Sequence, residues 1–194
     1  MDVRNDPFSQ APVPDAEAVR VLVGRLREGD GDAAAMLDAL FREALLRFCW
    51  GYLGSMEEAE DVLQEVWYKT LTASHIPDRF RPWIYRIARN ESLNLIRKRV
   101  KRRDRAGLPA ASQVGEYLTG QLTRLVKGEE KSRLRDLVSR LSEAQQEALR
   151  LRYVEGLGRG EIAEVLGVPE SVVKSRLFEG LKRLREHSSL LEDI

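Results

Sequence analysis

Residues 158–186 read GRGEIAEVLGVPESVVKSRLFEGLKRLRE, and their spacing indicates two helices joined by a tight turn. Ala163 is a small residue where two helices must approach closely, and Gly167, four residues later, supplies the turn. Val173 follows six residues after Gly167, where it would insert the second helix against the first. This pattern is typical of a helix-turn-helix, whose second helix enters the DNA major groove. The stretch therefore predicts a helical domain that binds duplex DNA.

The second helix of this motif, predicted over about 170–187, carries the side chains that would meet DNA. Arginine and lysine can hydrogen-bond guanine, and serine can donate or accept. A plain helical hairpin with a charged surface is the structural alternative, but it leaves the coincidence of turn spacing and basic helix unexplained. We predict duplex-DNA contacts from Glu170, Ser171, Lys174, Ser175, Arg176 and Arg183.

Apolar residues recur at three- and four-residue spacing through most of the chain, which predicts helices, and the sequence has no convincing strand pattern. Ser55 with Glu58, and Ser142 with Gln145, have the capping-box pattern that opens a helix. Asp32 is the expected N-cap of another helix. The predicted helices span about 15–27, 33–53, 56–73, 82–104, 129–140, 143–155, 159–166 and 170–187.

Residues 106–128 contain Gly, Pro, Ser and Ala with little periodicity, which predicts a flexible linker with a short helix around 117–126. The expected fold class is therefore all-α, with two small helical domains joined by that linker, the second containing the helix-turn-helix. We place the first domain at 15–105 and the second at 129–187, after a disordered lead at 1–14 and before a tail at 188–194.

The net charge of +1 conceals a strong segregation of charge along the chain. Residues 1–70 hold 7 basic and 14 acidic residues, a net charge of −7. Residues 71–105 hold 11 basic and 3 acidic residues, a net charge of +8, whereas 106–194 hold 14 of each sign. This segregation predicts a polyanion partner for the middle segment and a basic partner for the acidic front.

One side of the predicted helix in 80–101 carries a continuous stripe of aromatic, cationic and amide side chains. Cations neutralise phosphate, aromatic rings offer stacking platforms and amides can bond exposed base edges, a combination that favours partly unstacked nucleic acid. The alternatives are that Trp83 belongs to the protein core and that the basic run 97–105 is simply solvated. The stripe consists of Trp83, Arg86, Asn90, Asn94, Arg97 and Lys101.

The outer face of the predicted helix 56–73 carries carboxylate and amide side chains at i, i+4 spacing. Paired carboxylates can perform acid–base chemistry or hold Mg²⁺, but no histidine partner and no phosphate-cradling glycine loop accompanies them. A solvated face and a docking ridge for a basic partner are the other interpretations. The ridge consists of Glu60, Asp61, Gln64, Glu65 and Tyr68.

These segments together resemble a bacterial RNA polymerase sigma factor of the extracytoplasmic-function (ECF) group. DVLQEVWYKTL at 61–71 is similar to that family's core-polymerase-binding helix, and FRPWIYRIARNESLNLIRKR at 80–99 to its minus-ten recognition and melting segment. Residues 141–185 are similar to its domain four, which binds the minus-35 element. The resemblance covers about 20–187 and implies an alternative sigma factor that directs core polymerase to promoters and helps open them.

The resemblance also implies roles for particular residues. The implied partner is core RNA polymerase, through its β′ clamp helices and its β flap. The acidic ridge would meet the clamp helices, and the loop 73–81 would receive a flipped minus-ten base. Asn94 departs from the family, which often has an acidic residue there. The implied core-polymerase contacts are Asp61, Gln64, Glu65 and Tyr68, and the implied minus-ten contacts are His75, Phe80, Trp83, Arg86, Asn90, Asn94, Arg97, Lys98 and Lys101.

Promoter opening needs binding energy rather than a chemical reaction, so we expect no enzyme, no catalytic residue, no cofactor and no metal. Cys49 is the only cysteine and no apolar run reaches about 18 residues, so we expect a cytoplasmic protein without membrane insertion. No accessory domain follows the helix-turn-helix, so regulation is expected from expression level or from a separate anti-sigma factor.

Three other functions stay open on the sequence alone. A stand-alone helix-turn-helix regulator would bind duplex operators by itself, usually as a symmetric dimer. A nucleic-acid enzyme would use the carboxylates of 57–65 in a metal-dependent reaction. A degenerate sigma-like domain would be kept only to bind an inhibitor, although the intact basic stripe argues against it.

Overall fold

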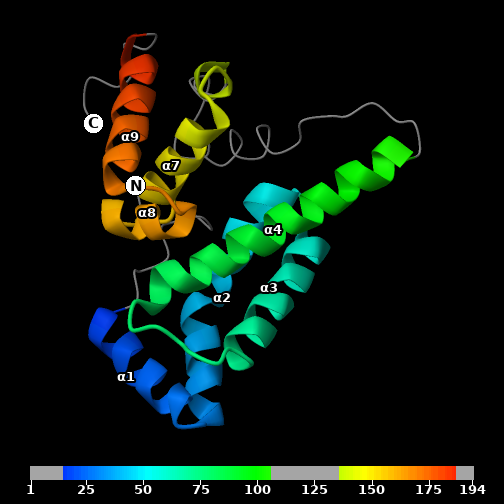
Figure 1. The fold of residues 1–194 in the computed structure, drawn as a ribbon, viewed down its shortest axis with the longest axis vertical. Helices are drawn as coiled ribbons and strands as arrows, with labels where there is room; N and C mark the ends of the chain where they lie inside the picture. The colour runs from blue at the N-terminus through cyan, green and yellow to red at the C-terminus, as the bar shows by residue number, and fades with distance from the viewer. Residues whose placement is uncertain (1–14, 106–135, 187–194) are drawn as a thin grey trace, which may run out of the picture.

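The computed structural model describes residues 15–105 and 136–186, and within these ranges it contains helices and no strand. The helices form an N-terminal group, α1–α4, and a C-terminal group, α7–α9, with the first turns of α4 lying beside α8 (Figure 1). The predicted all-α fold with a helix-turn-helix in its second part is thereby confirmed. The helices are α1 Ala16–Arg27, α2 Gly31–Leu53, α3 Met56–Leu71, α4 Phe80–Arg105, α7 Glu143–Tyr153, α8 Arg159–Leu166 and α9 Glu170–Glu186.

Some of the predictions concern residues outside the described ranges. These are the lead at 1–14, the linker at 106–128 with its short helix, and the tail at 188–194. Of the helix expected at 129–140, the structure describes only the last part, with residues 136–139 helical. The domain boundaries therefore stay predictions.

Local side-chain chemistry sets where α1 and α2 begin and end. Asp15 caps α1 by accepting a hydrogen bond from the backbone N–H of Ala18 at 3.1 Å. The expected N-cap of α2 was wrong by two residues, because Asp30 rather than Asp32 accepts from the free N–H groups of the first turn. Gly54 ends α2 in the left-handed conformation, with φ 68°.

The two predicted capping boxes have different outcomes. At Ser142 and Gln145 the box is complete, because each side chain accepts a hydrogen bond from the other residue's backbone N–H, at 3.3 and 3.1 Å. At the start of α3, Ser55 accepts from the N–H of Glu58 at 3.4 Å, but the Glu58 carboxylate pairs with Arg99 of α4 instead. That ion pair ties the start of α3 to the second half of α4.

The core of the N-terminal group is apolar and draws on α2, α3 and α4. Phe41 of α2 and Phe80 of α4, each 1% exposed, meet edge to face with ring centroids 5.6 Å apart. An edge-to-face arrangement is favourable for the ring quadrupoles and adds to the burial of both rings. The fully buried side chains around them include Leu37, Leu45, Phe48, Ala59, Val66, Ile84 and Ala88.

The predicted helix-turn-helix is α8 and α9. Gly167 has φ 66° at the end of α8, a conformation that glycine adopts without steric cost, and its N–H donates to the carbonyl of Ala163. Val173 is fully buried against the α8 side of the motif, as its spacing predicts. Helix α9 also packs closely on α7, because a Cβ atom on Gly180 would lie 3.0 Å from Cδ1 of Leu149.

Candidate nucleic-acid interface

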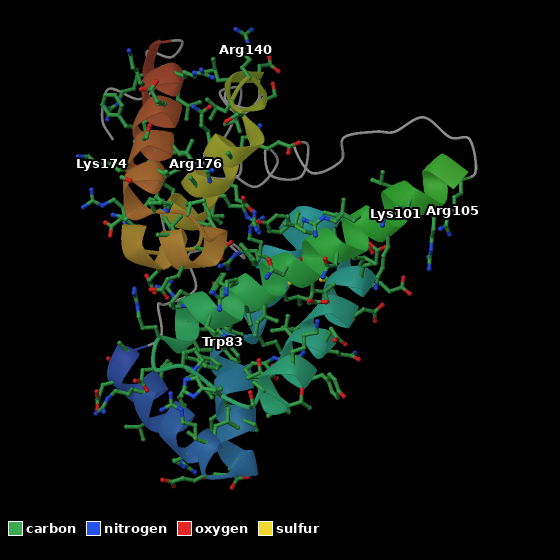
Figure 2. The ribbon with its side chains drawn as sticks, in the orientation of Figure 1. Trp83, Lys101, Arg105, Arg140, Lys174 and Arg176 are labelled. Atoms are coloured by element: carbon green, nitrogen blue, oxygen red, sulfur yellow. The ribbon has the colours of Figure 1, made fainter. Side chains whose placement is uncertain are left out.

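The predicted stripe on α4 forms a continuous surface along one side of the helix. Figure 2 shows Trp83 near the start of α4 and Lys101 and Arg105 at its far end. Trp83 and Asn94 are half-buried. The cationic and amide side chains that are exposed along this side are Arg86, Asn90, Arg97, Lys98 and Lys101.

Asn94, the residue that departs from the family pattern, is tied to its neighbours on α4. Its Oδ1 accepts a hydrogen bond from Nη1 of Arg97 at 3.1 Å, and its Nδ2 donates to Oε1 of Glu91 at 3.5 Å. An acidic residue here would place a second negative charge beside Glu91. The amide instead satisfies both a cation and a carboxylate, and it holds Arg97 on the stripe.

Phe80 does not lie on this surface. Its side chain is 1% exposed and packs between Phe41 and Trp83, with ring centroids 5.6 and 5.8 Å away. The expected contact of Phe80 with DNA therefore does not fit the structure, because the spacing 80, 84 and 88 places the ring on the core side of α4. Trp83 takes an intermediate position, with one part of its side chain on Phe80 and another on an open cavity.

That cavity, of about 400 Å³, lies between the loop before α4 and the C-terminal group. His75, Trp83 and Arg86 are among its lining residues, so an aromatic face and two hydrogen-bonding groups surround the space. Glu164 of α8 forms one wall and makes an ion pair with Arg79 of the loop. The position of this cavity matches the loop 73–81 for which a flipped base is expected.

The predicted acidic ridge is exposed on α3. Asp61, Gln64 and Glu65 are all solvent-exposed, and Tyr68 is 64% exposed. Lys69 lies beside the ridge, with its Nζ 2.7 Å from Oε1 of Glu91 and 3.7 Å from Glu65. The hydrogen bond with Glu91 raises the pKa of Lys69.

The predicted DNA-reading face of α9 is also accessible. Ser171, Lys174 and Ser175 are exposed, and Arg176 is half-buried. Figure 2 shows Lys174 and Arg176 on α9. Glu170 at the start of the helix is exposed and forms an ion pair with Arg159 at 3.5 Å. Arg183, also exposed, donates to Oε1 of Gln145 at 3.4 Å.

A buried ionic contact between the two helix groups is the feature that the sequence did not predict. We name it the intergroup contact, and its central pair is Arg89 of α4 with Glu147 of α7. The Nε and Nη2 atoms of Arg89 donate to the two carboxylate oxygens of Glu147 at 2.7 and 3.0 Å. The hydroxyl of Tyr52 donates to the same carboxylate. The contact comprises Arg47, Tyr52, Arg81, Tyr85, Arg89, Glu147, Arg150 and Glu155.

Arg150 is the most enclosed member of the intergroup contact, at 0% exposure. Its guanidinium carbon lies over the rings of Phe48 and Tyr52, 4.5 and 4.7 Å from their centroids, and Nη2 donates to the carbonyl of Phe48. A cation over aromatic faces is stabilised by their quadrupoles. Its Nε lies 3.8 Å from Oε1 of Glu155.

Glu155 receives donors from the N-terminal group. Nη2 of Arg47 donates to Oε2 at 3.4 Å and the hydroxyl of Tyr85 donates to the same oxygen at 3.3 Å. Nη2 of Arg81 donates to the backbone carbonyl of Glu155 at 2.7 Å. Arg81, Tyr85 and Arg89 are spaced four residues apart, so they share the side of α4 that faces away from the stripe.

Burial and neighbouring charges shift the pKa values of three groups in the intergroup contact. Burial raises the pKa of Tyr52 and of Tyr85, and the nearby carboxylates of Glu147 and Glu155 add to this. Burial acts to lower the pKa of Arg89, but its hydrogen bond and charge interaction with Glu147 outweigh this, so the pKa is raised. Both tyrosines therefore remain neutral donors to the carboxylates.

None of the helices in residues 15–105 and 136–186 combines the length and the apolar character that a membrane span requires. The same ranges contain no group of three or more His, Cys, Asp or Glu side chains arranged to hold a metal ion.

Comparison with protein families gives matches in both helix groups. The model described as sigma-70 region 2 matches residues 39–102, which include most of α2, all of α3 and most of α4. The model described as sigma-70, region 4 matches residues 131–184, which include α7, α8 and most of α9. The two matches occur in this order along the chain.

Similar proteins align with nearly the whole chain. The RNA polymerase sigma-H factor of Pseudomonas aeruginosa is 30% identical over 169 residues, which cover 81% of this chain and 86% of the relative. The ECF RNA polymerase sigma factor SigW of Bacillus subtilis is 26% identical over 178 residues, covering 87% and 95%. The solved structure of CnrH in complex with the cytosolic domain of CnrY has a TM-score of 0.61 at 23% identity, covering 87% and 96%.

Proposed function

This chain belongs to the sigma-70 family of RNA polymerase sigma factors, in its ECF group, and we propose how its surfaces divide the work of an alternative sigma factor. Such a protein binds core RNA polymerase, directs it to promoters and helps open the DNA. The observation that carries this conclusion is the ordered match of regions 2 and 4 to the two helix groups. A stand-alone helix-turn-helix regulator does not account for the region 2 match.

The acidic ridge on α3 is proposed as the main docking surface for core polymerase. Asp61 and Glu65 give a fixed negative charge, and the exposed Tyr68 ring adds an apolar anchor of the kind enriched at interface centres. Leu71 extends the apolar part, at 56% exposure. We assign this ridge to the β′ clamp helices and the C-terminal group to the β flap.

The α4 stripe and the adjoining cavity are proposed to hold the opened minus-ten element. Opening the duplex breaks base stacking of about 1.4 kcal/mol per step. A base stacked on an aromatic ring regains ~1–3 kcal/mol, and the cations Arg86, Arg97 and Lys101 would neutralise the separated strand. Phe80 supports this surface from the core rather than contacting DNA.

The outer face of α9 is proposed to read the minus-35 element in the major groove. Lys174 and Ser175 are exposed near its N-terminus, where recognition helices meet base edges. Arg183, near the other end, is proposed to contact the phosphate backbone. In this assignment, residues 15–105 and 129–187 are the two functional domains.

We also propose a protein regulator and a cytoplasmic site of action. CnrH, which shares the fold, was solved with the cytosolic domain of another protein, and a partner of that kind fits the resemblance to ECF sigma factors. Each step assigned above uses binding energy alone, so we propose no catalytic activity, cofactor or metal for this chain.

Run-off transcription with core RNA polymerase tests the proposal, using promoters selected from random DNA. We expect transcripts and a specific footprint only when polymerase and this protein are combined. Lys174→Ala should reduce minus-35 affinity by ~1–3 kcal/mol, whereas Trp83→Ala should leave closed-complex binding intact and slow strand opening. An equal footprint without polymerase would favour the stand-alone regulator, and failure to associate with polymerase would reject the sigma-factor function.

A further inference from the structure

The loop between α3 and α4 has little hydrogen bonding of its own to fix its shape. In the part of the chain that the structure describes, no backbone-to-backbone hydrogen bond involves residues 73–79. Yet this loop contributes His75, Pro77, Asp78 and Arg79 to the lining of the cavity proposed for a flipped base. A pocket that selects a base must present its lining groups at fixed positions, so the loop needs support from another element.

Arg27 supplies this support from the end of α1, which the loop passes on its way to α4 (Figure 1). Its Nε donates a hydrogen bond to the carbonyl oxygen of Ile76 at 2.9 Å, and its Nη2 donates to the same oxygen. Nη2 also donates to Oδ1 of Asp78 at 2.8 Å. Among the described residues, Arg27 is the only side chain from outside the loop that donates hydrogen bonds to residues 73–79. We name these contacts the Arg27 clamp.

The chemistry of arginine suits this clamp. A guanidinium is planar and presents its N–H groups in a rigid fork, so it fixes the Ile76 carbonyl and the Asp78 carboxylate relative to each other. Pro77 stands between them, with its φ angle restrained by the ring. The Ile76 side chain is 7% exposed and packs in the apolar core, which anchors the same residue a second time. Residues 76–78 are thus held in place beside the cavity.

Arg27 itself does not face the base. It is not among the residues that line the cavity, whereas Asp78, which it holds, is one of them. All contacts of the clamp lie within the N-terminal group, between α1 and the loop. Neither family match includes α1, since the two matches begin at residues 39 and 131. The structure therefore gives α1 a contact with the proposed minus-ten site that the family comparison does not supply.

We propose that Arg27 is a positioning residue for minus-ten recognition, because it preforms the loop 73–79 around the space for a flipped base. This inference rests on the proposed function, since it takes the cavity to be a base pocket. Without the clamp, residues 76–78 would sample other shapes, and binding would have to order them at a cost in affinity. The preferred base loses most, because it uses the full set of lining groups. Helix α1 thereby takes part in choosing the promoter sequence.

Binding of single-stranded DNA by the holoenzyme tests the proposal. Core polymerase carrying this protein is titrated with fluorescent minus-ten oligonucleotides from a selected promoter, in which each position is varied to all four bases. Selectivity at a position is the ratio of the Kd values for the other bases to that for the preferred base. For Arg27→Gln we expect selectivity to fall on the order of 10-fold at one position, the one that enters the cavity. Unchanged selectivity everywhere, or an equal loss at every position, would overturn the proposal.

Arg20→Gln is the matched control for charge. Arg20 lies on the same helix and bonds Glu17, and it makes no hydrogen bond to the described residues of the loop. The hydrogen bond and charge of Glu17 raise the pKa of Arg20, and the charge of Asp78 adds to this. The variant therefore removes a cation that Asp78 senses without removing a bond to the loop. We expect unchanged selectivity, and a loss as large as that of Arg27→Gln would assign the effect to net charge and overturn the proposal.

Arg27→Lys separates the geometry of the clamp from its charge, and it keeps the proposal testable should Arg27→Gln fail to fold. Lysine retains the cation and can donate to the Ile76 carbonyl, but it has no planar fork to hold Asp78 at the same time. We expect a selectivity between those of the unchanged protein and Arg27→Gln at the same single position. A lysine variant that selects bases as sharply as the unchanged protein would show that the fork is not required, and would overturn the proposal.

The design separates this proposal from the sigma-factor function. Absence of run-off transcription and of minus-ten binding by the unchanged holoenzyme would reject the function. With transcription intact, a selectivity that does not respond to Arg27→Gln rejects only the role of Arg27. Affinity for duplex minus-35 DNA should be the same in all variants, because the clamp involves no residue of the C-terminal group. A parallel loss of minus-35 affinity would indicate general damage to the fold and overturn the proposal.

Discussion

The core of the N-terminal group and the intergroup contact both bury side chains, but they do so by opposite chemistry. Around Phe41 and Phe80 the buried side chains are mainly apolar, and they come from the N-terminal helices and the loop before α4. Around Arg150 the buried groups are ions and phenols from helices far apart in the sequence. The core is stable because exposing it to water is costly, whereas water can solvate every charged group of the contact.

This difference indicates that the molecule has one permanent and one reversible junction. Apolar burial is non-directional and tolerates small shifts, so the α1–α4 group should move as a unit. Charged hydrogen bonds such as Arg89 to Glu147 depend on geometry, and they are lost together when the groups separate. The following changes test this contrast, starting with the one expected to have the largest effect.

Phe41→Ala should damage the permanent junction most. The ring is 1% exposed and packs on Phe80, so its removal leaves a cavity that the surrounding helices cannot fill. We expect a loss of about 3–5 kcal/mol in the free energy of unfolding, measured by urea titration with circular dichroism. Leu40→Ala is the matched control, because Leu40 is adjacent on α2 but 43% exposed. Equal losses for both variants would contradict the assigned core.

Glu147→Gln should affect the reversible junction without unfolding the protein. The amide keeps the shape of the side chain but removes the negative charge to which Arg89 and Tyr52 donate hydrogen bonds. We expect the arrangement with the two groups in contact to lose about 1–3 kcal/mol relative to the separated one, measured by energy transfer between dyes on the two groups. Glu179→Gln, on the exposed side of α9, should have no effect. Global unfolding of Glu147→Gln would show that the contact belongs to the core.

Asp30→Ala should weaken the permanent junction modestly. Its carboxylate accepts from the backbone N–H groups of Asp32 and Ala33 at 2.9 and 3.4 Å, and loss of an N-cap costs typically ~1 kcal/mol. Urea titration of Asp30→Ala beside Asp32→Ala compares the observed cap with the one expected from the sequence. A larger loss for Asp32→Ala would reverse that assignment.

Alkylation of Cys49 should give the smallest effect, because the thiol is almost unreactive while the protein is folded. Burial raises its pKa to about 12, so very little thiolate is present near neutral pH, and the thiolate is the reactive form. Alkylation near pH 8, followed by mass spectrometry, should be negligible in buffer and rapid in denaturant, where the pKa returns to about 8.5. Rapid alkylation in Arg89→Glu would show that opening the contact also loosens the core.

Sequence periodicity predicted the permanent parts of the fold well. The helix-turn-helix spacing gave the bounds of α8 as 159–166, and the structure has Arg159–Leu166. The N-cap of α2 was missed because GDGD offers two aspartates two residues apart, and local pattern does not choose between them. The family resemblance implied a DNA contact for Phe80, whereas its register with Ile84 and Ala88 places the ring in the core.

The intergroup contact could not be predicted from local sequence patterns, for a different reason. Arg150 donates to a carbonyl 102 positions away in the sequence, and no helical period relates them. Arginine and glutamate on a helix ordinarily predict a solvated face, so their burial contradicts the usual preference of the residue type. The i, i+4 series of Arg81, Tyr85 and Arg89 is the local signal that could have indicated a second contact face on α4.

Gly180 has a consequence for how promoter preference can change during evolution. A Cβ atom at this position would lie 3.0 Å from Cδ1 of Leu149, so a side chain there would require either the Leu149 side chain or α9 to shift. The absence of a side chain at Gly180 therefore helps to set how closely α9 packs on α7. Lys174 and Ser175, by contrast, can be substituted without changing the contact between Gly180 and Leu149, since both are exposed. New base preferences can therefore arise while the orientation of α9 relative to α7 stays constant.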